Sequence, residues 1–321
     1  MFDIAGKTVF VTGASGLIGS SVVKVLLDAG ANVIAAGRSV ERLQGKLGEI
    51  PGLSFSQYDA TRRNVFTFKA DCMVIAASPA SPDLFLSKPV DLMLANTVAV
   101  CELLDYAIKA RIGKVVYVSS SEVYGKMEPP ATGFTEDHFG EIDLANPRNC
   151  YAESKRAAEL LCVSYASQYG LDVSIVRPGH VYGPTATDND KRVSSLWPRM
   201  AAKGEDIVMK SDGAQLRSYV YCHDCATAIL TVIQKGAPAK AYNISNRDSV
   251  VSIRTLAETI CRIANVKLRM EVPSDSEKKR FNPMAISSLD ASALEDLGWR
   301  AEYDIERGLS EHLSVLNQRE W

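Results

Sequence analysis

The chain lacks the features that mark membrane, secreted and nucleic-acid-binding proteins. Among its 321 residues no apolar run approaches the roughly 18 residues that would suggest a membrane span. Its seven cysteines are scattered and odd in number, without a disulfide rhythm, and no basic-then-apolar leader opens the sequence. A formal net charge of −2 offers no general attraction to nucleic acid or to an anionic membrane. We therefore expect a cytoplasmic protein that binds neither.

What is present is the composition of a folded protein, with 46% hydrophobic and 23% charged residues. In the first half, short apolar runs rich in β-branched residues alternate with segments of helical periodicity. Strands are predicted over residues 7–12, 32–36, 53–58, 72–77, 114–119 and 172–177, and helices over residues 17–29, 90–110 and 151–169. This alternation is typical of an α/β fold whose parallel sheet is covered by helices on both faces.

Three glycines, Gly13, Gly16 and Gly19, lie three residues apart between the first predicted strand and its helix. A strand that enters a helix beside a pyrophosphate needs a tight turn, a close backbone approach and close helix–strand packing. The helix amino terminus then offers N–H groups and partial positive charge to the phosphates. The pattern predicts a dinucleotide-binding, Rossmann-type doubly wound sheet, with Ser15, Leu17 and Ile18 completing the cofactor loop.

The choice between NAD and NADP depends on the end of the second predicted strand. An acidic residue at that position accepts the ribose hydroxyls of NAD, but this chain has Arg38 followed by Ser39. An arginine beside a serine suits the 2′-phosphate of NADP. If Arg38 is merely solvated, it does not select NADP, and the cofactor is NAD. Asp59, after the third strand, either faces the adenine or belongs to a turn. Both cofactors stay open at this point.

Tyr151 and Lys155 are spaced i, i+4 on a predicted helix, so their side chains share one face. For a tyrosine to act as a base near neutrality, its pKa must fall by roughly 3 units, or about 4 kcal/mol. A neighbouring ammonium and a positive nicotinamide ring can supply this by stabilising the phenolate. Lys155 can also hold the nicotinamide ribose, and Ser120 at the end of the fifth strand can bind the substrate oxygen being oxidised.

The regular alternation ends near residue 180. We expect residues 1–180 to form the dinucleotide-binding domain and residues 181–321 to form mainly a smaller, mixed α/β substrate-binding lobe. Residues 217–235 are expected to return to the first domain. Cys222 and Cys225 flank His223 and Asp224, but no second pair of ligands with suitable spacing appears, so no metal site is predicted.

Several stretches together resemble one enzyme family. They are TGASGLIG (12–19), SSSEVYG (119–125), YAESK (151–155), VYGP (181–184), RSYVYCHD (217–224) and LGW (297–299). The chain resembles extended short-chain dehydrogenases/reductases of the NAD-dependent epimerase/dehydratase family over essentially its whole length. The resemblance implies a catalytic Ser120, Tyr151 and Lys155, with Asn96 as a structural and water-relay residue. It implies further cofactor contacts at Ala76, Ala77, Ser78 and Pro178, and diphosphate contacts at Arg217 and Arg280.

The resemblance is strongest to UDP-glucuronate decarboxylases. Ser121-Glu122 stands where dehydratases of this branch carry Asp-Glu, so the acid expected for dehydration is absent. The stretches ASPASP (77–82), PRNCYAESKRAAE (147–159) and NDKRVSS (189–195) are similar to the decarboxylases too. The resemblance implies a nucleotide-diphosphate sugar that is oxidised at carbon 4 and contacted by Ser121, Glu122, Arg192 and Arg217. In it Glu122 positions the sugar and Arg217 stabilises or protonates an enolate.

Some features depart from the pattern and keep alternatives open. His180 stands where relatives commonly have Asn, and it either changes the diphosphate or sugar contacts or simply packs. The Asp that often follows Arg280 is missing. A 4-epimerase or ketoreductase acting on a neutral nucleotide sugar is the alternative, and a non-catalytic dinucleotide sensor is a remote one. Relatives usually form homodimers through the 90–110 helix and the helix that carries Tyr151, and we expect the same here.

Overall fold

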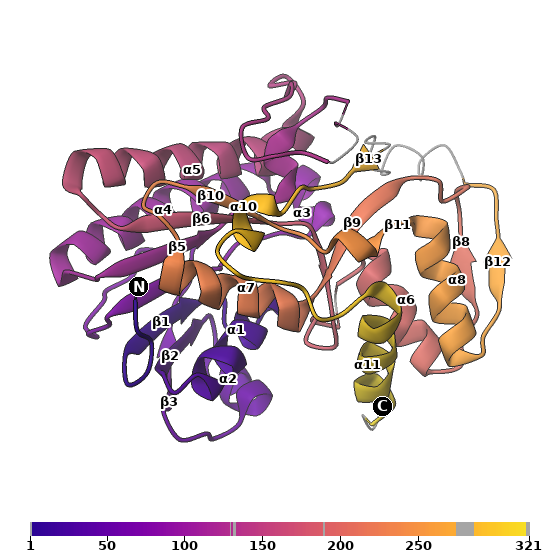
Figure 1. Cartoon of the computed structure of the whole chain (residues 1–321), viewed down its shortest axis with the longest axis horizontal. Helices are drawn as coiled ribbons and strands as arrows, with labels where there is room; N and C mark the ends of the chain where they lie inside the picture. The colour runs from indigo at the N-terminus through magenta and orange to yellow at the C-terminus, as the bar shows by residue number, and fades with distance from the viewer. Residues whose placement is uncertain (1, 129, 131–132, 189, 274–285, 319–321) are drawn as a thin grey trace.

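A seven-stranded parallel sheet forms the larger part of the computed structural model, which describes residues 2–128, 130, 133–188, 190–273 and 286–318 (Figure 1). Its strands are β1 (Thr8–Thr12), β2 (Asn32–Gly37), β3 (Leu53–Gln57), β4 (Cys72–Ile75), β5 (Lys114–Val118), β6 (Val173–Pro178) and β10 (Ala241–Ile244). They lie in the order β10-β6-β5-β4-β1-β2-β3, and every neighbouring pair is parallel. The predicted Rossmann-type sheet is confirmed.

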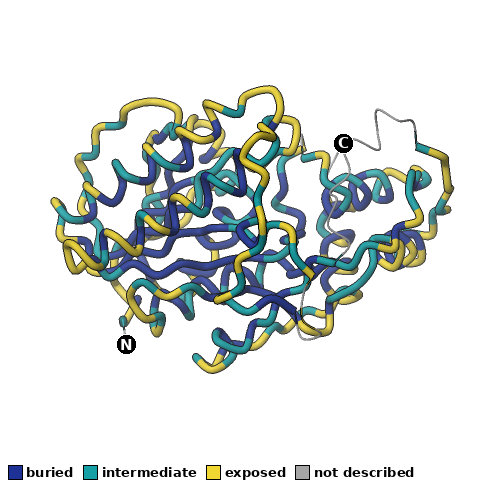
Figure 2. The backbone as a smooth tube through the Cα atoms, turned by 90° about the horizontal axis from the view of Figure 1, so that it is seen from above, coloured by how far each residue is buried: buried dark blue, intermediate teal, exposed yellow. Residues whose placement is uncertain are grey.

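Helices cover both faces of this sheet. On one face lie α1 (Leu17–Asp28), α2 (Val40–Leu47) and α7 (Cys222–Lys235), and on the other α4 (Pro89–Ala110) and α5 (Cys150–Tyr169), with the short α3 (Pro82–Ser87) preceding α4. Side chains of β1 enter the hydrophobic core on both faces of the sheet. Val9 and Val11 pack toward α1 and α7, and Phe10 packs toward α4 and α5. Seen from above, the strands of this sheet are mostly buried (Figure 2), except the edge strand β3, whose residues are partly or fully exposed. None of the helices within the described residues is long and apolar enough to cross a membrane.

The strand order reverses between β1 and β4, because the chain runs from β1 toward β3 on one side and from β4 toward β10 on the other. Parallel α/β sheets bind ligands outside the carboxyl ends of the strands at such a reversal. The loops after β1, β4 and β5 meet at this edge. The topology therefore places the glycine loop next to Ala76, and Ser120 follows β5, one strand farther along the same edge.

The smaller part contains two short sheets. In one, β9 (Leu216–Tyr221) pairs with β7 (His180–Tyr182), β11 (Val250–Ser252) and β13 (Ile286–Ser287), and in the other β8 (Ile207–Met209) pairs with β12 (Leu268–Met270). Its helices are α6 (Val193–Ala202), α8 (Ile253–Ala264) and α11 (Ile305–Asn317), whereas α10 (Ser292–Glu295) packs against β10 of the larger sheet. The part of the chain that the structure describes also contains three 3₁₀ turns: η1 (Ser121–Tyr124), η2 (Pro147–Asn149) and η3 (Arg247–Ser249).

The chain passes more than once from the smaller part back to the larger sheet. Residues 222–235 form α7 on the face of that sheet, but residues 217–221 belong to β9 of the smaller part, so the segment expected to return as a unit is divided. Strand β10 also returns, as the seventh strand beside β6. Its sequence, AYNI, is too short and too polar to show a strand period, and only its pairing with β6 identifies it.

Candidate active site

The loop between β1 and α1 is shaped by the absence of side chains. Gly13 has a φ of +68°, and a Cβ there would lie 2.8 Å from the nitrogen of Ala77 and 2.9 Å from the carbonyl carbon of Ala76. At Gly19 a Cβ would lie 2.2 Å from the carbonyl oxygen of Gly13, and at Gly16 3.2 Å from the same oxygen. No larger residue fits at Gly13 or Gly19 unless the backbone moves. The loop thus has the tight turn and close helix–strand approach that a pyrophosphate site requires.

The remaining residues of this loop face a helix end suited to an anion. Leu17 and Ile18 form the first turn of α1, where N–H groups lack intrahelical partners, and that turn contains no acidic residue. The Ser15 carbonyl accepts a hydrogen bond of 2.8 Å from Nζ of Lys46. The same ammonium donates to the Thr185 carbonyl at 2.5 Å, so Lys46 connects the glycine loop to the chain that follows β7.

Arg38 and Asp59 lie at the ends of β2 and β3. Arg38 is exposed, and the Ser39 hydroxyl caps α2 by accepting from the Arg42 N–H at 3.1 Å while donating to the Glu41 carboxylate at 2.8 Å. Asp59 accepts from both the N–H and the hydroxyl of Thr61. Although burial opposes it, these bonds lower the pKa of Asp59. Asp59 therefore has the bonding of a turn residue.

Ala76, Ala77 and Ser78 follow β4 and approach the loop from the other side. The Thr12 hydroxyl accepts from the N–H groups of Ala76 and Ala77 at 3.0 and 3.1 Å, so the ends of β1 and β4 are held together. Pro178 ends β6, where its register partner on β10 is Ile244.

Asn96 connects three elements beneath the site. It is 1% exposed on α4, accepts from the Ser78 hydroxyl at 2.7 Å and donates to the Ser154 hydroxyl of α5 at 3.1 Å. Since a buried amide must satisfy its polar atoms, these bonds set the position of α4 relative to α5.

Ser120, Tyr151 and Lys155 lie close together in the structure. Tyr151 and Lys155 are 7% and 2% exposed, and the Tyr151 hydroxyl hydrogen-bonds with the hydroxyls of Ser120 and Ser78. Nζ of Lys155 donates to the Val118 carbonyl at 2.8 Å and lies 5.9 Å from the centre of the Tyr151 ring. This arrangement can transfer a proton between Tyr151 and a substrate hydroxyl bound at Ser120.

Burial dominates the titration of this pair. It raises the pKa of Tyr151 to about 12, with a further increase from the Glu122 charge. It lowers the pKa of Lys155 to about 7, even though the Glu159 carboxylate opposes this. For Tyr151 to act as a base near neutrality, additional positive charge must therefore lie beside it.

The side opposite the glycine loop carries a carboxylate and several guanidiniums. Burial raises the pKa of Glu122, while the charges of Arg148 and Arg217 lower it. Arg217 is 3% exposed on β9 and donates to the Leu216 carbonyl at 2.7 Å. Ser121, next to Glu122, is buried in η1. Glu122 thus lies in the field of two arginines from different elements.

Arg192 and His180 complete this side. Arg192 precedes α6, is bound to Asp190 at 2.5 Å, and its charge acts on Tyr151. Burial, with Arg217 and then Arg192, lowers the pKa of His180 to about 3. The structure therefore gathers five of the six residues predicted to contact substrate, and the sixth, Arg280, lies outside the described residues.

Arg148 is a residue that the sequence analysis did not single out. It lies in η2, its guanidinium is 5.9 Å from the centre of the Phe85 ring, and its charge acts on Glu122. The signal was available, because Arg148 precedes Tyr151 by three residues, about one helical turn.

A buried ion pair ties the helix of Tyr151 to the turn of Glu122. Arg177 on β6 donates to Glu159 of α5, with its Nη2 2.7 Å from Oε2, and its Nη1 donates to the Tyr124 hydroxyl at 3.1 Å. Glu159 is one turn after Lys155, and Tyr124 ends η1. The ion pair therefore fixes the spacing between the two halves of the site.

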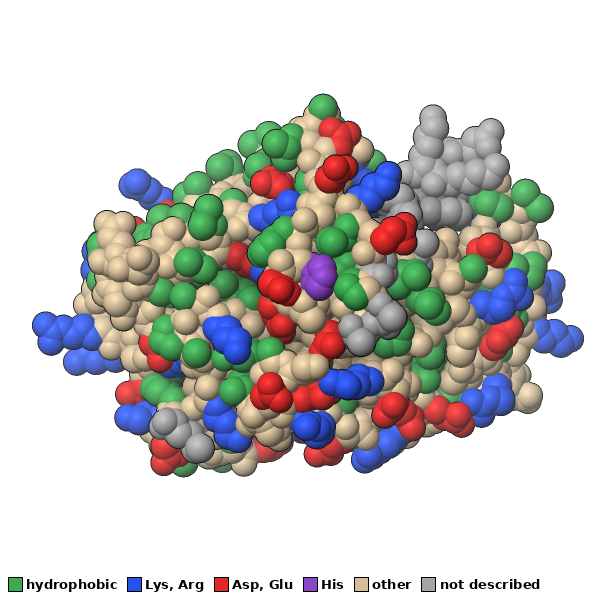
Figure 3. Space-filling model, turned by 45° about the horizontal axis from the view of Figure 1, so that its top comes forward, with side chains coloured by type: hydrophobic (Ala, Val, Ile, Leu, Met, Phe, Trp, Pro, Cys, Tyr) green, Lys and Arg blue, Asp and Glu red, His purple; other side chains and the backbone are tan. Residues whose placement is uncertain are grey.

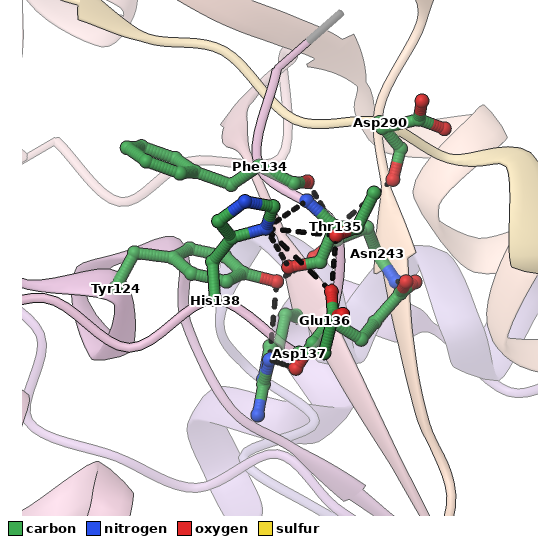
Figure 4. Close-up of polar contacts among 9 residues, drawn as sticks. Tyr124, Phe134, Thr135, Glu136, Asp137, His138, Asn243 and Asp290 are labelled. Atoms are coloured by element: carbon green, nitrogen blue, oxygen red, sulfur yellow. Dashed lines mark hydrogen bonds and ion pairs between the residues drawn. The ribbon is translucent and has the colours of Figure 1, made fainter. Parts of the chain in front are cut away.

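The same cluster continues to the edge of the sheet (Figure 4). Asn243 of β10 accepts from the Tyr124 hydroxyl at 2.5 Å and donates to the carbonyls of Phe134 and Asp290 at 2.8 and 2.9 Å. The Glu136 carboxylate accepts from the Asn243 N–H at 2.6 Å. The segment after η1 is thereby fixed to β10.

The Cys222–Cys225 stretch has a packing role in the structure. Asp224 accepts from the backbone N–H groups of Glu302 and Tyr303 at 3.1 and 3.0 Å, which occupies its carboxylate. Within the described residues no three His, Cys, Asp or Glu side chains are grouped as a metal site would require.

Known proteins of one family are similar to this chain. Residues 9–245 match the model of the NAD-dependent epimerase/dehydratase family. The chain is 29% identical over 316 residues to UDP-glucuronic acid decarboxylase 6 of Arabidopsis thaliana, covering 96% of this chain and 88% of that protein.

Two solved structures share the fold. One is the UDP-glucose 4-epimerase of Thermotoga maritima with UDP-glucose, at 21% identity and a TM-score of 0.82, covering 97% of this chain and 99% of that one. The other is a dTDP-glucose 4,6-dehydratase of Bacillus anthracis in complex with NAD, at 20% identity and a TM-score of 0.79, covering 98% of each chain. With the family match over residues 9–245, the chain belongs to the NAD-dependent epimerase/dehydratase family.

Proposed function

We propose that this enzyme oxidises carbon 4 of a nucleotide-activated sugar and that its substrate is UDP-glucuronate, which it decarboxylates. The observation that carries the proposal is the charge around Glu122, where Arg148 and Arg217 both act on one carboxylate beside Tyr151. Both guanidiniums attract anions to this place, and a sugar carboxylate at carbon 6 is an anion that a neutral hexose lacks. The similarity to a plant UDP-glucuronic acid decarboxylase supports the same substrate.

The cofactor that we propose is NAD. The glycine loop fits a pyrophosphate, because a Cβ at Gly13 or Gly19 would occupy backbone positions. Beside Arg38, the Ser39 hydroxyl already serves as a helix cap and hydrogen-bonds with Glu41. That carboxylate opposes a 2′-phosphate, so the local charge favours NAD over NADP despite Arg38. When bound, the nicotinamide ring supplies a hydride acceptor and positive charge beside Tyr151.

In the proposed reaction Ser120 binds the carbon-4 hydroxyl and Tyr151 removes its proton as the carbon-bound hydrogen leaves as hydride. Lys155 stabilises the phenolate of Tyr151, which counteracts the effect of burial on the pKa of that hydroxyl. Asn96, 1% exposed, keeps α5 in place beneath the reacting groups. The resulting carbon-4 ketone lies β to the carbon-6 carboxylate.

The carbon–carbon bond then breaks without a further oxidant. Carbon dioxide leaves with its two oxygens, and the bonding electron pair enters an enolate over carbons 4 and 5. Arg217, buried on β9, stabilises the enolate oxygen or supplies a proton. Protonation of carbon 5 regenerates the ketone. A bound NAD would supply the hydride that carbon 4 takes back, and Tyr151 would return the proton to the carbon-4 oxygen, which gives the pentose.

The test is incubation of the purified, NAD-loaded protein with UDP-glucuronate, followed by mass spectrometry. Loss of one carbon dioxide from the sugar is expected. Replacing Arg148→Gln should lower kcat/KM for UDP-glucuronate at least about 10-fold, since it removes a charge-assisted contact. Arg62→Gln, at a guanidinium with 80% exposed side chain, is the control. Conversion of UDP-glucose to its 4-epimer, with UDP-glucuronate untouched, would replace the decarboxylase by the 4-epimerase alternative.

We further propose a homodimer formed by α4 and α5. Apolar side chains lie exposed on these helices, with Leu94, Val98 and Leu160 each at least 50% accessible. Figure 3 shows hydrophobic side chains over this part of the surface. We also propose a cytoplasmic location, because all seven cysteines are free thiols, which persist in reducing compartments.

A further inference from the structure

His180 occupies a confined position where the two parts of the molecule join. It is the first residue of β7 and pairs in register with Tyr219 of β9, whose ring centre is 5.8 Å away. Paired residues of neighbouring strands point to the same face, and so do residues two apart on one strand. His180, Tyr219 and Arg217 therefore share the face that also receives Glu122 and Arg192.

The charged groups that act on His180 are cations. Arg217 of β9 and Arg192 at the start of α6 lower its pKa, after burial. The charged groups on the other elements packed against β7 have partners of their own. Before and on α6, Asp190 binds Arg192, and Arg199 donates to the carbonyls of residues 187 and 190. On α7, Asp224 accepts from the backbone N–H groups of residues 302 and 303. From α1, the nearest polar group toward this region is the Ser21 hydroxyl, which contacts Thr185.

The imidazole also has an unsatisfied atom. Within the described residues, Nδ1 of His180 is buried and no group hydrogen-bonds with it. A buried polar atom without a hydrogen-bond partner is energetically unfavourable. Nδ1 of His180 is therefore able to gain a hydrogen bond when a ligand enters the site. The imidazole thus has a polar atom to offer a ligand that enters beside Arg217 and the Arg192–Asp190 pair.

We propose that His180 takes up a proton when the diphosphate of a nucleotide sugar binds between Arg192 and Arg217, so that substrate affinity increases as the pH falls. This inference rests on the nucleotide-sugar substrate proposed above. The diphosphate of such a sugar carries two negative charges. One negative charge about 4 Å from an imidazole changes its proton affinity by about 1,000-fold at an effective dielectric constant of about 20. The bound anion thus reverses the field that keeps His180 neutral.

Proton uptake and affinity are linked. If the ligand raises the pKa of His180, the complex holds more protons than the free protein at any pH between the two values. Affinity then increases as the pH falls through the pKa of the complex and levels off below that of the free protein. Loss of the imidazole removes this dependence, whereas a packing role for His180 would not create it.

Calorimetric titration with UDP-glucose tests the inference. The diphosphate of this ligand does not titrate between pH 6 and pH 8 and its sugar is uncharged, so proton uptake belongs to the protein. In two buffers of different ionisation enthalpy, NAD-loaded protein is expected to take up about 0.5–1 proton at pH 6 and close to none at pH 8. Affinity should be about 2–10-fold higher at pH 6 than at pH 8. His180→Asn should abolish both effects, and His223→Asn, on α7, should leave both unchanged.

Equal proton uptake by the wild-type protein and His180→Asn would overturn the inference. If the variant does not fold, the wild-type protein decides: it has four histidines, and NMR of ring-labelled histidine should show one imidazole whose pKa rises on addition of UDP-glucose. Four unchanged imidazoles would refute proton uptake while leaving nucleotide-sugar binding intact. Absence of UDP-glucose binding at every pH would instead overturn the proposed substrate class and, with it, this inference.

Discussion

Replacing Gly19→Ala should destabilise the protein, although alanine is the better helix former. Gly19 lies in the first turn of α1, and in an unobstructed helix the substitution gains roughly 0.5–1 kcal/mol. At this position, however, the new Cβ would lie 2.2 Å from the carbonyl oxygen of Gly13 and 2.7 Å from its carbonyl carbon. Both are backbone atoms, so relief requires α1 or the loop to move by about 1 Å.

Overpacking of this kind costs about 1–3 kcal/mol, which exceeds the gain in helix propensity. We expect the free energy of unfolding to fall by about 1–2 kcal/mol and the Kd for NAD to increase at least about 10-fold, since the displaced loop holds the pyrophosphate. Chemical denaturation measures the first and calorimetric titration the second.

Gly45→Ala is the matched control. Gly45 lies within α2, and an added Cβ there meets nothing within 4 Å. This variant should gain about 0.4–1 kcal/mol and keep its NAD affinity. If Gly19→Ala is as stable as Gly45→Ala and binds NAD equally well, the argument from close helix–strand contact is wrong.

Three further predictions follow from buried charges and exposed apolar residues. Burial lowers the pKa of Lys155 to about 7, so the unfolded chain binds more protons than the native state between about pH 7 and 10.5. In this range the contribution of Lys155 to the free energy of unfolding therefore rises with pH, by at most about 1.4 kcal/mol per pH unit. Lys155→Met should abolish that rise in denaturation curves recorded at several pH values. Arg177→Met removes the guanidinium whose Nη2 lies 2.7 Å from the buried Glu159 carboxylate, and it should lower the free energy of unfolding by about 3–5 kcal/mol. The double variant Arg177→Met/Glu159→Leu should recover much of that loss, because no unpaired charge is left buried. No recovery in the double variant would contradict the ion-pair explanation. Leu94→Glu, at a side chain that is 50% exposed on α4, should convert the proposed dimer to a monomer, as measured by light scattering. The control Val65→Glu, at a side chain that is 90% exposed after β3, should remain a dimer. If Leu94→Glu also remains a dimer, the interface lies elsewhere.

Much of the larger sheet could be predicted because its signals are local. Residues 114–119 and 151–169 were expected as strand and helix, and the structure has β5 (Lys114–Val118) and α5 (Cys150–Tyr169). The i, i+4 spacing of Tyr151 and Lys155 needs no more than one helix to bring them to one face. By contrast, β10 escaped prediction, since four residues show no period until β6 lies beside them.

The substrate side of the site was only partly predictable. Family resemblance indicated Glu122, Arg192 and Arg217 one by one, but nothing in their spacing indicated which charges act on one another. The spacing of Arg148 to Tyr151 placed it near the site, but its effect on Glu122, which is 26 positions earlier in the chain, became visible only in the fold. The pairing of Ser39 with Glu41 likewise changed the interpretation of Arg38.

By itself, then, the sequence determined the strand–helix alternation, the glycine loop and the Tyr151–Lys155 pair, because each depends on backbone preferences and periodicity over a few residues. Only the tertiary structure decided which distant groups meet: the Tyr124 hydroxyl with Asn243, 119 positions apart, and His180 with Arg192 and Arg217. The physical reason is that burial and electrostatic fields depend on distance in space. The pKa of a carboxylate, an ammonium or an imidazole therefore depends on which groups the fold places beside it.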